Sequence, residues 1–140
     1  MPAHTTSILA GGNIYPSRFI KISTSADNTA LQAGSNEDVI GISTEATKDA
    51  PLSGASAYAG VDTYQMHYYP NGTECLLEIG SGGVTRGDYL KSDTNGKGVS
   101  AATTGPTAQF IGAQALESAA AGDFARVMVM RIPKYYPALS

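Results

Sequence analysis

The stretch "RFIKIST" at residues 18–24 returns as "DYLKSDT" at residues 88–94. A second echo follows each copy, "VIGIS" at 39–43 and then "FIGAQ" at 110–114. The copies lie 70 or 71 positions apart, and six aligned positions are identical once a single residue is inserted. The sequence therefore predicts one structural unit that is used twice.

The two repeat-like halves span residues 18–46 and 88–118. Duplication of an ancestral segment would explain their similarity, and so would convergence, because strand–turn–strand units tend toward similar patterns. Both explanations give the same architecture, in which a strand, a turn-rich loop and a strand with a central glycine occur twice in one compact β-fold.

Alternation of apolar and polar residues predicts strands in both halves. In "FIKIS" Ile20 alternates with Lys21, and in "YLKSD" Leu90 alternates with Lys91. Asn95-Gly96 is typical of a two-residue hairpin turn. Turn signals recur along the chain, which favours an all-β fold, a small β-sandwich or barrel. The apolar positions expected to share one interior are Ile20, Ile40, Leu90 and Ile111.

The composition limits the classes of function. The chain has a mass of 14.4 kDa, which fits one domain or two very small half-domains that share a core. Charged residues make up 15% of the chain, against roughly 25% in an average domain. Its net charge is −3, and its nine basic residues are scattered. We therefore expect no nucleic-acid partner, since phosphate binding needs a clustered basic face.

We expect neither a membrane segment nor a secretion signal. No apolar run approaches the ~18 residues of a spanning helix, and the start "MPAHTTSILAGGNIYPS" has no basic region followed by an apolar core. The protein is thus expected to be made in the cytoplasm of its host cell. The single cysteine, Cys75, alternates with Leu77 and Ile79 and is expected to be buried.

No group of residues carries an enzyme signature. The carboxylates Glu45 and Glu117 occupy nearly matching places in the two halves and could act as an acid–base pair, although such residues more often cap turns or face water. "GSGG" at 80–83 lacks the Lys-Ser/Thr of a phosphate-binding loop. We expect no catalytic residues, no metal and no cofactor.

An aromatic cluster occurs in "DTYQMHYYPNGT". It contains Tyr64, His67, Tyr68 and Tyr69. One interpretation is a stacking platform for a ligand, or a metal site with Asp62; the other is packing against neighbouring protein. Zinc needs three or four close ligands, and no second His or Cys lies nearby, so packing or an interface is favoured.

Two longer stretches resemble a known family. "GDYLKSDTNGKGVSAATT" at 87–104 and "FIGAQALESAAAGDFARVMVM" at 110–130 are similar to the C-terminal signature of bacteriophage capsid decoration proteins, also called cement proteins. "RFIKISTSADNTALQAGSNEDVIGISTEATKDAPLSG" resembles members of the same group, so the similarity spans about residues 18–131. The shared motifs are turns and strands, and they carry no active site.

The resemblance implies a β-rich domain on the outer surface of an icosahedral head. Its partners would be the major capsid protein and itself, commonly as a homotrimer at threefold positions. The alternative function is a receptor- or carbohydrate-binding module of the head-fibre type, with the Tyr64–Tyr69 cluster as its platform. A small enzyme built on Glu45 and Glu117 is the third possibility.

The expected division of the chain is an extended N-terminal arm at 1–17, a β-domain at 18–132 and a C-terminal tail at 133–140. Interfaces concentrate aromatic and apolar residues and deplete charge at their centres. The candidate contacts to the capsid or to a sibling subunit are Ile8, Leu9, Ile14, Tyr15, Tyr64, His67, Tyr68, Tyr69, Tyr135 and Tyr136.

Overall fold

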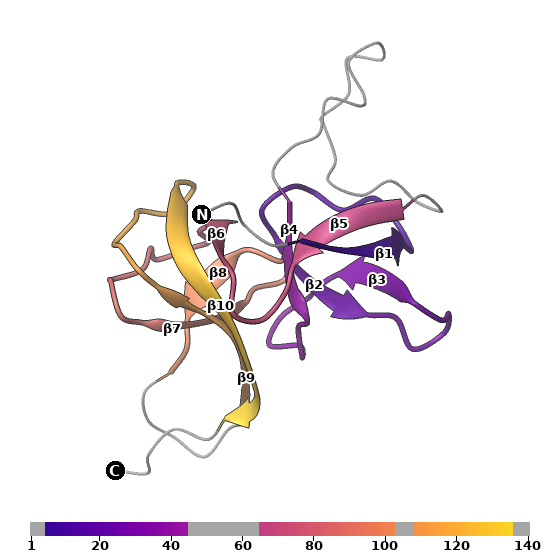
Figure 1. The fold of residues 1–140 in the computed structure, drawn as a ribbon. Helices are drawn as coiled ribbons and strands as arrows, with labels where there is room; N and C mark the ends of the chain where they lie inside the picture. Colours follow the sequence, from indigo (N-terminus) through magenta and orange to yellow (C-terminus); the bar gives the residue numbers. More distant parts are fainter. Residues whose placement is uncertain (1–4, 45–64, 103–107, 136–140) are drawn as a thin grey trace.

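The computed structural model describes residues 5–44, 65–102 and 108–135. Within these ranges the chain forms ten strands and no helix. The expected all-β class, a small barrel or sandwich, is thereby confirmed. The strands gather in two lobes that lie side by side (Figure 1).

Lobe 1 holds the first five strands, which form a closed barrel in the order β1-β3-β2-β4-β5. Lobe 2 holds the other five, in a sheet of order β6-β10-β9-β7-β8. The strands of lobe 1 are β1 (Thr6–Ala10), β2 (Phe19–Ile22), β3 (Thr29–Gln32), β4 (Gly41–Ser43) and β5 (Gln65–Tyr69). Those of lobe 2 are β6 (Glu74–Glu78), β7 (Tyr89–Ser92), β8 (Gly98–Ser100), β9 (Gln109–Ala115) and β10 (Phe124–Tyr135).

The two lobes share one topology. In lobe 1, β2 lies between β3 and β4, β5 pairs with β4 and β1, and β1 runs parallel to β3. In lobe 2, β7 lies between β8 and β9, and β10 pairs with β9 and β6. A single parallel bridge from Ile79 to Gly98 joins β6 to β8. The internal repeat therefore covers all five strands of each lobe.

Matching hydrogen bonds fix which residues are equivalent. The amide of Gly11 donates to the carbonyl of Ala30, and the amide of Gly80 donates to that of Gly98, both at 2.8 Å. Equivalent residues of the two hairpin turns are left-handed, Asn28 with φ of 50° and Gly96 with φ of 79°. The repeat is thus longer than the echoes in the sequence indicate.

The interpretation of residues 1–17 as an arm separate from the domain is wrong for the part the structure describes. β1 pairs with β5 and β3, and the side chains of Ile8 and Ile14 are buried in lobe 1. These pairing partners lie about twenty and sixty residues further along the chain, so local sequence gives no sign of them. The proposed tail also begins too early, because β10 continues to Tyr135.

The expectation of one shared interior is also wrong, because each lobe has its own core. Ile20 packs with Ile8 and Met66 inside lobe 1, with Ile40 against their edge. Leu90 packs with Leu77 inside lobe 2. Ile111 is buried as well, at 1% exposure. The two similar strand units therefore enclose two separate hydrophobic cores instead of packing against each other around a single core.

Lobe 1 seals the open side of lobe 2. The amide of Glu78 donates to the carbonyl of Ser17 at 2.9 Å, and the amide of Phe19 donates to the carbonyl of Gly96 at 2.7 Å. The guanidinium of Arg18 contacts the carboxylate of Glu78 at 3.1 Å and the carbonyl of Asn95 at 2.8 Å. Residues 17–19 therefore lie where β6 and β8 would otherwise pair, as β1 and β3 do in lobe 1.

The ring of Phe19 belongs to the core of lobe 2, although its strand belongs to lobe 1. It packs over Gly112 of β9: a Cβ at that position would lie 2.5 Å from both Phe19 Cε1 and Val39 Cγ2. The central glycine of the second echo is therefore required by a close approach between the lobes.

The loop between β3 and β4 is anchored by two ion pairs. Lys21 Nζ lies 2.7 Å from Glu37 Oε2, and Arg131 of lobe 2 binds Asp38 at 2.6 Å. The hydrogen bond from Lys21 lowers the pKa of Glu37 below its usual range, against a smaller opposing effect of desolvation. The hydrogen bond to Asp38 raises the pKa of Arg131.

Replacement of Gly112 by Ala tests the contact between the lobes. Because the new methyl group collides with Phe19 and Val39, we expect a loss of about 1–3 kcal/mol in the free energy of unfolding, measured by urea titration. Gly12→Ala is the matched control, since a Cβ there meets no atom within 4 Å. Equal effects of the two substitutions would contradict the packing described.

The Lys21–Glu37 pair predicts a pH-dependent contribution to stability. A carboxyl group whose pKa is lowered by folding stabilises the fold above its normal pKa and loses that effect as the pH falls through the folded value. Glu37→Gln should therefore cost about 0.5 kcal/mol at neutral pH, as expected for a half-exposed pair. The difference from the unsubstituted protein should shrink as the pH falls below the usual carboxyl pKa and vanish once Glu37 is protonated in the folded state. A constant difference across this range would refute the assignment.

Candidate functional site

The aromatic cluster in β5 does not form one platform in the described residues. Tyr68 packs against the core of lobe 1, whereas Tyr69 packs against that of lobe 2. His67 is exposed and lies opposite Ser7 of β1. Tyr64 and Asp62 lie outside the described residues. The rings of Tyr68 and Tyr69 are therefore used mainly for packing, which was the favoured interpretation.

The N-terminal candidates divide into two groups. Ile8 and Ile14 are buried in lobe 1, so neither side chain is available to a partner. Leu9 and Tyr15 remain exposed, at 42% and 39%. The ring of Tyr15 lies beneath the guanidinium of Arg18, 5.0 Å from its carbon, which links it to the contact between the lobes.

The C-terminal candidates lie at the end of the chain. The backbone of Tyr135 pairs with Gln109 at the end of the β9–β10 ribbon. Tyr136 lies outside the described residues.

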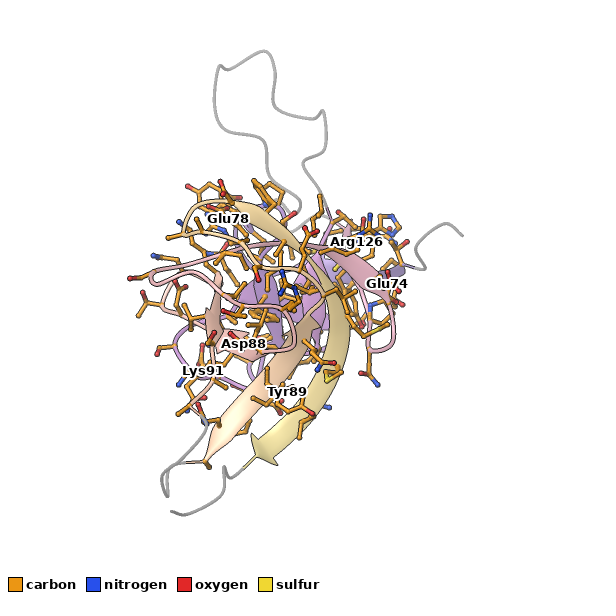
Figure 2. The ribbon with its side chains drawn as sticks, turned by 90° about the vertical axis from the view of Figure 1, so that its left-hand side faces the viewer. Glu74, Glu78, Asp88, Tyr89, Lys91 and Arg126 are labelled. Atoms are coloured by element: carbon orange, nitrogen blue, oxygen red, sulfur yellow. The ribbon has the colours of Figure 1, made fainter. Side chains whose placement is uncertain are left out.

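Sequence reasoning missed a group of exposed apolar side chains on the outer side of lobe 2, where the ion pair of Arg126 and Glu74 also lies (Figure 2). Tyr89, Leu116 and Phe124 are exposed there, at 38%, 41% and 50%. Figure 2 looks onto this side, with Tyr89 beside the long β9–β10 ribbon. Alternation along β7 and β10 could have placed Tyr89 and Phe124 outward, since Leu90 and Ala125 next to them are buried.

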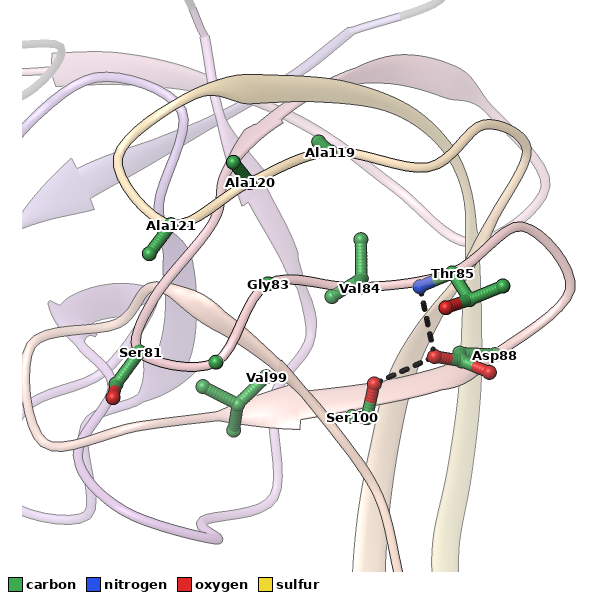
Figure 3. Close-up of a pocket in the computed structure, with 11 residues that line it drawn as sticks. Ser81, Gly83, Val84, Thr85, Asp88, Val99, Ser100, Ala119, Ala120 and Ala121 are labelled. Atoms are coloured by element: carbon green, nitrogen blue, oxygen red, sulfur yellow. Dashed lines mark hydrogen bonds between the residues drawn. The ribbon is translucent and has the colours of Figure 1, made fainter.

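A hollow of about 550 Å³ opens beside β8. It lies between the β6–β7 loop and the β9–β10 loop (Figure 3). Small side chains line it, among them those of Val84, Val99 and Ala119–Ala121. The Asp88 carboxylate at its edge accepts hydrogen bonds through Oδ2 from the Thr85 amide at 3.0 Å and the Ser100 hydroxyl at 2.7 Å.

The hollow reflects a difference between the lobes. The positions in lobe 1 that match Thr85 and Ser100 are Tyr15 and Gln32, and the side chain of Gln32 accepts a hydrogen bond from the Tyr15 amide at 3.0 Å. Larger side chains thus occupy this place in lobe 1. With one carboxylate and no His or Cys in its lining, the hollow offers no group that could act as a base beside a nucleophile.

The described residues contain no group of three or more His, Cys, Asp or Glu side chains arranged to hold a metal ion. Glu117 caps the turn after β9, where its carboxylate accepts the Arg126 amide at 3.0 Å. Glu45 lies outside the described residues, so the pairing of the two carboxylates stays a hypothesis. Cys75 is buried, as its strand pattern predicts.

No helix in the described part of the chain is long and apolar enough to cross a membrane.

No protein-family model matches the sequence, and no curated protein matches it either. A solved structure does share the fold: the N base of the head fibre protein gp8.5 of bacteriophage phi29 superposes with a TM-score of 0.62 at 18% sequence identity. The match covers 95% of this chain and 98% of that one. The two-lobed fold as a whole is therefore similar to that of a phage head-fibre base.

Proposed function

We propose that the chain is a structural protein of a bacteriophage head, a decoration or cement protein that binds the outer surface of an icosahedral capsid and stabilises it against internal DNA pressure. The observation that carries this proposal is the match to a head-fibre base over nearly the whole length of both chains. The resemblance of residues 18–131 to decoration proteins supports the same class independently of the fold.

The mechanism is mechanical. A cement protein buries surface across the boundaries between capsomers, so that expansion of the shell has to break additional contacts. A two-lobed body suits this role, because the backbone hydrogen bonds between Ser17, Phe19 and lobe 2 tie the lobes together. Low charge, at 15% of residues, also suits a protein whose surface is largely covered by other protein.

The proposed partners are the major capsid protein and further copies of this chain, as a homotrimer. The proposed location is the outer surface of the virion. The role requires no enzyme activity, metal, cofactor or nucleic-acid partner, and no membrane.

A receptor- or carbohydrate-binding module of the head-fibre type is the second proposal. The head-fibre origin of the similar structure favours it. The Tyr64–Tyr69 cluster is a weaker candidate for its binding platform than the sequence indicated, because Tyr68 and Tyr69 pack against different cores. Glycan binding that is lost on substitution of His67, the exposed member of the cluster on β5, would favour this function over cementing.

Binding to heads tests the cement proposal. Purified protein is mixed with heads assembled from the major capsid protein of the same genome, and the mixture is sedimented. We expect saturable binding to the heads, and decorated heads that withstand higher temperatures than bare ones. Bovine serum albumin serves as a control for nonspecific trapping.

Absence of the protein from the sedimented heads would overturn the proposal. Binding without any gain in thermal resistance would support an attached module of the fibre type instead of a cement.

A further inference from the structure

The exposed large apolar side chains of the described residues fall at particular places in the repeat. They are Leu9, Tyr15, Ile22, Tyr89, Leu116 and Phe124. Tyr15 is covered in part by Arg18. The other five lie on two surfaces. Each is equivalent, in the repeat, to one side of the contact between the lobes, but lies outside that contact.

In lobe 1, one outward row of side chains is covered by lobe 2. The row crosses three neighbouring strands, with Phe19 opposite Ile42 and Ile42 opposite Tyr69. Phe19 and Ile42 are completely buried, and all three side chains pack against the core of lobe 2.

The same row exists in lobe 2, where its side chains are partly exposed. Tyr89 lies opposite Gln114, and Gln114 lies opposite Met128, on the strands equivalent to those of lobe 1. Tyr89 matches Phe19 but is 38% exposed. Leu116 and Phe124 lie beside this row. The exposed Arg126, which pairs with Glu74 at 3.7 Å, stands on the same face between Phe124 and Met128. We call this surface, made of Tyr89, Gln114, Leu116, Phe124 and Met128, the outer face of lobe 2.

The surface of lobe 2 that receives lobe 1 also has an uncovered equivalent. Lobe 2 receives lobe 1 at Glu78, at the carbonyl of Ser92 and at the hairpin turn Asn95–Gly96. The matching positions in lobe 1 are Leu9, Ile22 and the turn Asp27–Asn28. Leu9 and Ile22 are 42% and 47% exposed. We call this surface the free edge of lobe 1.

We propose that the outer face of lobe 2 in one copy docks on the free edge of lobe 1 in a second copy. We expect the partner to be a second copy, because within one chain the equivalent face of lobe 1 is already packed against the equivalent edge of lobe 2. Each chain also carries a second face and a second edge, both with exposed apolar side chains. Burial of apolar surface would drive the association.

The contact between copies differs from the internal one in two respects. Lobe 1 is already closed between β1 and β3, since the amide of Leu9 donates to the carbonyl of Asn28 at 3.1 Å. No backbone segment of the second copy can therefore be inserted there, and side chains make the contact. The ion pair of Arg18 with Glu78 is also absent, because Asp88 and Leu9 stand at those positions. The Asp88 carboxylate is already bonded to Thr85 and Ser100 within its own lobe.

Such a contact is heterologous, because two different surfaces meet. Repetition of a heterologous contact either closes into a ring or continues as a filament. The homotrimer of the proposed function would be a closed ring of three copies; only this number rests on that proposal, whereas the pairing of face and edge rests on the structure alone.

Two variants, each with one surface disrupted, test the pairing. Tyr89→Glu places a charge in the outer face, and Leu9→Glu places one in the free edge; Ala121→Glu, in an exposed loop, is the control for charge. In analytical ultracentrifugation the unsubstituted chain and the control should form closed oligomers. Each of the two variants alone should associate at least tenfold more weakly.

Mixing the two variants is the decisive step. The intact edge of Tyr89→Glu and the intact face of Leu9→Glu can form one contact, so the mixture should contain dimers of twice the 14.4-kDa chain mass and no larger rings. This result also shows that both variants are folded. Met128→Glu should behave as Tyr89→Glu does.

The pairing would be overturned by an unsubstituted chain that stays monomeric, by undiminished association of Leu9→Glu, or by a mixture that does not associate. Failure to bind heads while rings still form would overturn the proposed function and leave this inference standing.

Discussion

The structure depends on the insertion of Ser17–Phe19 into the open side of lobe 2. In lobe 1 the first and third strands pair directly, whereas in lobe 2 the equivalent strands keep only the bridge from Ile79 to Gly98. The amide of Glu78 and the carbonyl of Gly96 bond instead to the backbone of lobe 1. Because buried backbone groups are costly to leave unpaired, lobe 2 needs lobe 1 to be complete. The chain is thus one body of two similar but unequal parts.

Strand β2 serves both cores because its side chains alternate. Ile20 points into lobe 1 and Phe19 points out of it, into lobe 2, and both are fully buried. Its equivalent β7 retains only half of this arrangement, with Leu90 buried and Tyr89 exposed. The outward side chain of β2 makes an internal contact because lobe 2 covers it. The equivalent side chain of β7 remains partly exposed and accessible to another molecule. In the proposed role on a capsid, such a surface would hold sibling subunits together while other surfaces contact the shell.

Local sequence was sufficient for most elements whose determining contacts lie close together in the chain. Alternation predicted the strands around Ile20 and Leu90, and Asn95-Gly96 predicted the position of the turn between β7 and β8. The expected two-residue turn is wrong, because residues 93–97 connect the strands and of the pair only Gly96 has a positive φ, at 79°. The burial of Cys75 followed from alternation as well. Sequence failed for residues 6–10, because β1 is held by β3 and β5 at a distance, and its short apolar run resembled a free terminus. The outer face of lobe 2 was missed because Tyr89, Leu116 and Phe124 lie on three separate segments.

The sequence by itself determined the all-β class, the use of one unit twice and the positions of most strands and turns, because these follow from side-chain alternation and from backbone preferences of Gly and Asn. Only the tertiary structure decided that the repeat comprises five strands, that it builds two cores, and that Gly112 lies beneath Phe19. It also decided which of two equivalent faces is covered. Contacts between residues about 60 to 90 positions apart make these choices, and neither copy of the repeat encodes them in its own pattern.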